Sequence, residues 1–150
     1  MKMLVYIDEY LTVQYDKKHL EMTIEWRKAS ARLLNENIAR RFMLIAEAMK
    51  KYRPKYVFSN FEDMVYSRIW GEEYLFYHNI HAVMLSAGIE KFAYIKSNDK
   101  ITKVLFDQLL YNSELKKVEM KNFKSHGEAE KWLIKERKVN KFNEKFAISA

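Results

Sequence analysis

The stretch His19-Leu20-Glu21-Met22-Thr23-Ile24-Glu25-Trp26 alternates strictly between polar and apolar residues. A period of two is typical of a β-strand with one buried side, here Leu20, Met22, Ile24 and Trp26, and one side facing water. The run from Leu11 to Tyr15 alternates in the same way, and only Asp16-Lys17-Lys18 separates the two. A polar connection that short predicts an antiparallel hairpin, to which residues 3–7 add a further expected strand.

After the hairpin the apolar period changes to that of an α-helix. Apolar residues recur at every third or fourth position, namely Leu34, Ile38, Phe42, Ile45, Met49 and Tyr52. This spacing places them on one face of a helix. We expect Ser30 to cap the first turn, because its hydroxyl can accept a hydrogen bond from a free backbone N–H. Pro54 predicts that the helix ends after Arg53.

Three further strand–helix units follow along the chain. Their strands are expected from Tyr56, over 92–95 and over 118–120, and their helices over about 71–87, after Asp99 and after Ser125. Gly88 suits the left-handed position past the second helix. Strands and helices that alternate in this way predict an α/β protein, with a largely parallel sheet and the antiparallel hairpin at one edge. The apolar periodicity fades after Glu136, so we expect one domain over residues 1–136 and a basic tail over 137–150.

The composition excludes several classes of protein. The 150 residues include no cysteine, which removes disulfides, thiolate catalysis and Cys-based metal sites. No apolar run approaches the roughly 18 residues of a membrane span, so we expect a soluble, cytoplasmic protein. The formal net charge is +7, but the basic residues lie on nearly every element and alternate with acids. A nucleic-acid-binding surface gathers its basic residues in one stripe, so we expect no nucleic acid as partner.

The hairpin that ends in Trp26 and the closing pattern Phe123-x-Ser125-x-x-Glu128-Ala129-x-x-Trp132-Leu133 resemble the SpoIIAA-like branch of the STAS domains. The segment from Asn79-Ile80-His81 through Gly88 to Ala93-Tyr94-Ile95 is similar to small bacterial members of that branch. The resemblance covers about residues 10–133. It implies a mixed sheet with helices mainly on one face. It also implies a non-catalytic regulatory module that binds a protein partner.

In the STAS domains the partner binds at the loop after the third core strand and at the following helix, where a phosphorylated Ser or Thr breaks the contact. Carried over, this region is Ser59 to Trp70, and Ser67 is the hydroxyl nearest the phosphorylated position. The sequence departs from the family here, because Tyr66-Ser67-Arg68-Ile69 replaces the Asp-Ser-Ser-Gly turn. Asn60 stands in place of the usual acid at the strand end. The candidate partner- or ligand-binding residues are Asn60, Asp63, Tyr66, Ser67, Trp70, Tyr74 and Tyr77.

Other chemistry has less support in the sequence. His78 and His81 lie three apart, but no third metal ligand follows from the spacing, so we expect no metal site and no cofactor. Glu62 and Asp63 follow a strand end, where α/β folds bind ligands, yet no motif places a nucleophile beside them. We therefore expect no enzyme. The aromatic content leaves a second interpretation open, a carrier or sensor of a small apolar ligand held between the sheet and the second helix. Self-association, for example as a homodimer, is compatible with either interpretation.

Overall fold

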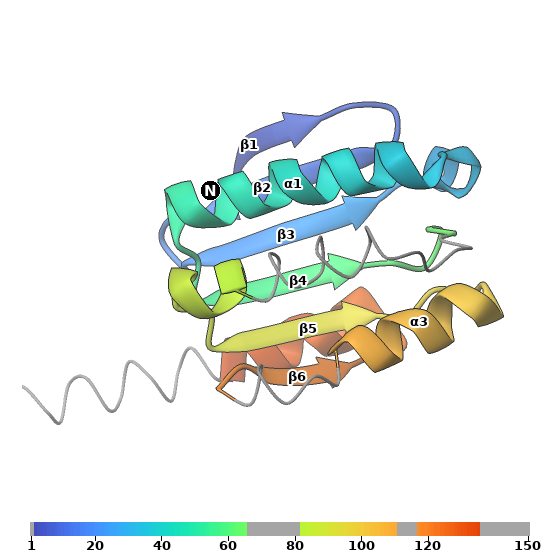
Figure 1. Ribbon diagram of the computed structural model, residues 1–150. Coiled ribbons are helices and arrows are strands. Elements are labelled where there is room, and N and C mark those ends of the chain that lie inside the picture. The colour runs from blue at the N-terminus through green and yellow to red at the C-terminus, as the bar shows by residue number, and fades with distance from the viewer. Residues whose placement is uncertain (1, 66–81, 111–116, 136–150) are drawn as a thin grey trace, which may run out of the picture.

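The chain folds around one six-stranded mixed sheet in the order β1-β2-β3-β4-β5-β6 (Figure 1). The computed structural model describes residues 2–65, 82–110 and 117–135. Along the chain, the strands and helices are β1 (Lys2–Ile7), β2 (Leu11–Asp16), β3 (Glu21–Trp26), the 3-10 helix η1 (Lys28–Arg32), α1 (Asn35–Tyr52), β4 (Tyr56–Asn60), β5 (Lys91–Ile95), α3 (Lys100–Leu110) and β6 (Glu119–Asn122). Further helix is present over 82–87 and 126–135. The α/β class and the alternation of helices and strands are confirmed.

The predicted hairpin is formed by β2 and β3. The two strands pair antiparallel, with Leu11 opposite Trp26 and Asp16 opposite Glu21, and β1 pairs antiparallel with β2. The turn is closed by the Asp16 carboxylate, which accepts hydrogen bonds from the backbone N–H of His19 at 3.3 Å and from its ring Nδ1 at 2.6 Å. The sheet therefore begins with three antiparallel strands.

From β3 onward each strand pairs in parallel with the next one along the chain. Because consecutive crossovers of one hand return on the same side of a sheet, the connecting helices share one face. Helices α1 and α3 accordingly lie on one face, and the orange-red helix over 126–135 lies behind the sheet (Figure 1). The larger core lies under the first face and includes Met22, Val57 and Phe92 of the sheet with Ile38 and Phe42 of α1.

A smaller core lies on the opposite face, beneath the helix over 126–135. Its buried members are Tyr56, Phe58, Ala93, Ile95, Ala129 and Leu133. This helix corrects one prediction. Glu21 and Thr23, expected to face water, are only 2% and 7% exposed. The polar side of β3 is buried because the last helix covers the face of the sheet that the crossover helices leave open.

Helix boundaries follow the predicted caps with one exception. Asp99 caps α3, since its carboxylate accepts hydrogen bonds from the N–H and the hydroxyl of Thr102 at 2.9 and 2.8 Å. Gly88 takes a left-handed φ of 80°. Helix α1 ends at Tyr52 with Arg53 as its C-cap, one residue before the end expected from Pro54. Ser30, however, does not cap α1. It is buried inside η1, and the extended Leu34 immediately precedes the first residue of α1, so the helix starts later than expected.

Candidate functional site

The structure describes two of the seven predicted binding residues. Asn60 is the last residue of β4, and Asp63 lies in the loop that follows. The remaining predicted residues, together with the two histidines considered as metal ligands, lie outside the described residues: Tyr66, Ser67, Trp70, Tyr74, Tyr77, His78 and His81. The described part of the candidate site therefore lies at the carboxyl ends of β3, β4 and β5.

The segment from Phe61 to Val65, called here the strand-end loop, is tied to β5 and to the residues after it. The N–H of Phe61 donates to the carbonyl of Ile95 at 3.0 Å, and the N–H of Asn98 donates to the carbonyl of Glu62 at 3.0 Å. The hydroxyl of Ser97 donates to the carbonyl of Met64 at 2.6 Å. These bonds fix the loop at both ends.

Two apolar side chains anchor the same loop in the core. Phe61 is 4% exposed, and its ring lies 4.9 Å from that of Phe106 in α3 and 6.5 Å from that of Phe42 in α1. Met64 is fully buried. Glu62 is exposed and Asp63 is partly exposed, so the anchored backbone presents two carboxylates outward. The loop thus combines a rigid inner side with an acidic outer side.

Asn60 connects this loop to β3. Its side-chain Nδ2 donates to Oε1 of Glu25 at 2.9 Å, and its Oδ1 accepts from the N–H of Glu62 at 2.9 Å. The parallel register explains the contact, because Glu25 and Asn60 are direct partners at the ends of their strands. A carboxylate in this position could not donate to Glu25, so the amide suits the place where an acid was expected from the resemblance.

Glu25 completes an acidic group with Glu62 and Asp63. Partial burial is the main reason why the pKa of Glu25 is raised, and the negative charges of Asp63 and Glu62 raise it further. The Asn60 amide and the charge of His126 act in the opposite direction. The sequence alone does not single out Glu25, because it is one of several residues on the polar side of an alternating strand. Only the pairing of β3 with β4 brings it to the strand-end loop.

A second polar group joins β3 to the last helix. The ring of His126 stacks on Phe58 with centroids 4.3 Å apart, and its Nε2 lies 3.3 Å from Oε1 of Glu130. The carboxyl group of Glu130 also interacts with that of Glu21 on β3. Burial would raise the pKa of Glu130, but hydrogen bonds with Glu21 and His126 and the charge of Lys2 lower it. These residues hold the helix on the sheet through polar as well as apolar contacts.

In the ranges 2–65, 82–110 and 117–135, no group of three His, Asp or Glu side chains could hold a metal ion. The buried hydroxyl nearest the strand-end loop, that of Ser97, is used in a hydrogen bond to the backbone. Three buried polar atoms on the described segments have no hydrogen-bond partner: Trp26 Nε1, Ser30 Oγ and Ser59 Oγ.

The chain matches no protein-family model, no curated protein and no solved structure. Among the helices of the described segments, none combines the length and the apolar character that crossing a membrane requires.

Proposed function

We propose that the protein is a non-catalytic, STAS-like regulatory module of the cytoplasm that binds a protein partner. The contact surface is the strand-end loop with Asn60 and Asp63, continued along the chain by Tyr66, Ser67, Trp70, Tyr74 and Tyr77. A phosphate on Ser67, which the sequence flanks with the aromatic residues Tyr66 and Trp70, would weaken the contact because its charge would have to be removed from water in an aromatic interface. The single observation that carries the proposal is the anchored strand-end loop with its outward carboxylates.

The way the loop is anchored favours recognition of another protein. A loop whose backbone is already fixed by hydrogen bonds loses little conformational entropy when a partner binds, which favours affinity. The bonds from Asn98 and Ser97 and the burial of Phe61 and Met64 supply this order.

The negative charge of the loop indicates which kind of partner surface it would bind. Glu62 and Asp63 form an acidic region with Glu25 on a chain whose net charge is +7. Complementary charge steers association and rejects wrong partners. We therefore expect a partner with a basic contact surface.

The test is affinity capture from cells of the source organism, followed by titration of the captured protein against variants. Ser67→Glu, Trp70→Ala and Asp63→Lys should each weaken binding at least tenfold. Glu36→Lys is the matched control, because it makes the same type of charge change at an exposed position in the first turn of α1. The proposal fails if all three variants bind like the wild type, or if Glu36→Lys weakens binding as much as Asp63→Lys.

A second candidate, a carrier of a small and largely apolar ligand, is favoured by one specific observation. The side chains of Trp26 and Ser59 are 1% exposed, and their polar atoms Nε1 and Oγ have no hydrogen-bond partner. Buried polar atoms are normally satisfied, so a ligand with one polar group would gain a hydrogen bond there. Native mass spectrometry of the purified protein tests this candidate. An adduct that is lost on denaturation supports it, and a bare polypeptide mass counts against it.

A further inference from the structure

The two edges of the sheet differ in what they expose. β6 is four residues long and carries the exposed Glu119 and Lys121. Charged and short edges prevent strands of other chains from pairing. β1 is six residues long and exposes Met3, Leu4 and Ile7, which are 46%, 52% and 55% accessible. No described strand pairs with its outer side, so β1 is an open apolar edge.

An irregularity in β1 places two of these side chains on the same face. Leu4 lies opposite Gln14, and Ile7 lies opposite Thr12, because the register shifts between Leu4 and Tyr6. Residues three apart in a regular strand point to opposite faces, whereas Gln14 and Thr12, two apart, share one face. Leu4 and Ile7 therefore both lie on the face of the sheet away from α1.

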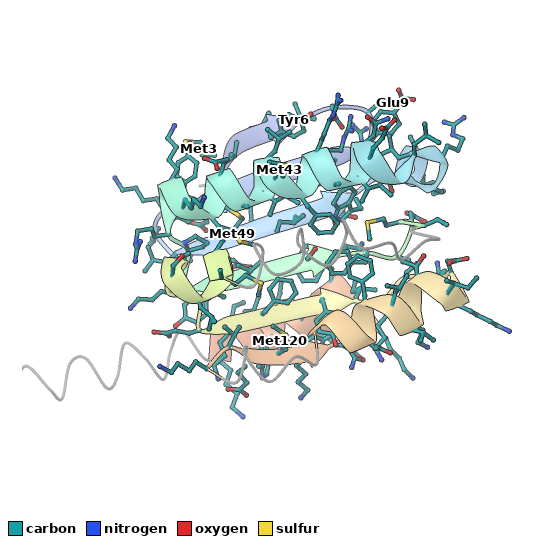
Figure 2. All side chains as sticks on the ribbon, in the orientation of Figure 1. Met3, Tyr6, Glu9, Met43, Met49 and Met120 are labelled. Atoms are coloured by element: carbon teal, nitrogen blue, oxygen red, sulfur yellow. The ribbon has the colours of Figure 1, made fainter. Side chains whose placement is uncertain are left out.

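The two ends of β1 carry opposite charges. Lys2 lies at its start, where its Nζ donates a long hydrogen bond of 3.5 Å to the hydroxyl of Thr23, and the exposed Glu9 lies in the bend after its end. Figure 2 shows Met3, Tyr6 and Glu9 along this side of the sheet. Asp8, at the same end as Glu9, is already held by Arg41, whose Nε and second guanidinium nitrogen both lie 2.9 Å from its Oδ2. Glu9 is therefore the carboxylate at this end that remains available for a cation from another chain.

We propose that β1 pairs antiparallel with β1 of a second copy of this chain across a two-fold axis. In the register that sets Leu4 opposite the partner's Ile7, Lys2 lies opposite the partner's Glu9, and Val5 lies opposite the partner's Tyr6. A two-fold axis repeats each of these pairs. Apolar and opposite-charge pairs across neighbouring strands are stabilising, and the backbone groups of β1 gain partners.

The pairing joins two six-stranded sheets into one of twelve strands. β4, which carries the strand-end loop, is separated from β1 by β2 and β3. The dimer would therefore leave both candidate sites open and would present two copies of the loop, which favours a partner with repeated contacts. The inference does not depend on the proposed partner binding, because it concerns a different edge of the sheet.

The test is sedimentation equilibrium of the full chain across a wide concentration range. The wild type should sediment as a dimer, and Leu4→Lys should raise the dissociation constant at least tenfold. Met43→Lys is the matched control, because Met43 is a comparably exposed apolar side chain, 62% accessible, on α1 (Figure 2). This control should remain dimeric, and far-UV circular dichroism confirms that each variant is folded.

A charge exchange tests the register itself. Lys2→Glu and Glu9→Lys each place like charges opposite one another, so each should weaken the dimer. The double variant restores opposite charges and should recover most of the lost affinity. A wild type that stays monomeric at every concentration overturns the proposal. So does a dimer that Leu4→Lys leaves intact, or a double variant that is no tighter than the single ones.

Discussion

Asn60→Ala should destabilise the fold by about 2 kcal/mol. The substitution removes the hydrogen bond from Nδ2 to Glu25 and the bond that Oδ1 accepts from the N–H of Glu62, both 2.9 Å long. A hydrogen bond to a charged group contributes about 1.5–3 kcal/mol, and the half-exposed position of Glu25 favours the lower end of that range. The bond to the neutral N–H adds about 0.5–1 kcal/mol. For a chain of this size the melting temperature should fall by roughly 4–8 °C.

Urea denaturation followed by tryptophan fluorescence measures this loss. The matched control is Asn98→Ala, because Asn98 is exposed and contacts the same loop through its backbone N–H, which alanine retains. The control should change the free energy of unfolding by less than about 0.5 kcal/mol. If the two variants lose the same stability, the side chain of Asn60 does not hold the loop, and the strand-end loop cannot be treated as an ordered binding surface.

Three further predictions concern other contacts. Burial and the nearby carboxylates raise the pKa of Glu25, so wild-type stability falls as the pH rises from the unfolded value of about 4.3 through the native value. Glu25→Gln should therefore gain stability relative to the wild type over that rise. A stability difference that is the same at acidic and neutral pH would contradict this. Arg41→Met breaks the ion pair with Asp8 and should cost about 1–2 kcal/mol in chemical denaturation. Arg40→Met, an exposed neighbour with the same charge change, should cost less than about 0.5 kcal/mol. Leu133→Ala leaves a cavity under the last helix and should lower the free energy of unfolding, measured by calorimetry, by about 2–4 kcal/mol. Ile134→Ala, at a position that is 38% exposed, should lower it by less than about 1 kcal/mol. Equal losses of stability would mean that this helix does not pack on the sheet through Leu133.

The sequence predicted the elements whose signals are local. Alternation over residues 11–15 and 19–26 identified β2 and β3, and the spacing from Ile38 to Met49 identified the buried face of α1. The spacing of apolar residues in such patterns directly indicates whether a segment is a strand or a helix. The start of α1 was wrong because Ser30 was chosen by residue type. The true boundary depends on η1, which packs a serine into the core and which no local period distinguishes from the first turn of an α-helix.

The candidate site was predictable only in part, because its contacts join distant parts of the chain. Asn60 was named from the family resemblance, and it is the last residue of β4. Its partner Glu25 is 35 residues earlier, and nothing between them signals the contact. The register of β3 against β4 sets this pair, and register follows from the packing of the whole sheet. A search for polar residues at the carboxyl ends of two adjacent parallel strands would have found both.

The polar side of β3 shows what alternation does and does not determine. A period of two separates polar from apolar residues, but it does not say that the polar side faces water. Here the helix over 126–135 carries a matching pattern, since Ala129 and Leu133 pack in the small core while His126 and Glu130 lie one turn apart beside Phe58 and Glu21. Because sequential parallel strands direct the crossover helices to one face, the helix after the last strand is free to cover the other. A closing amphipathic helix with a polar stripe is therefore itself a signal that the polar face of a central strand is covered.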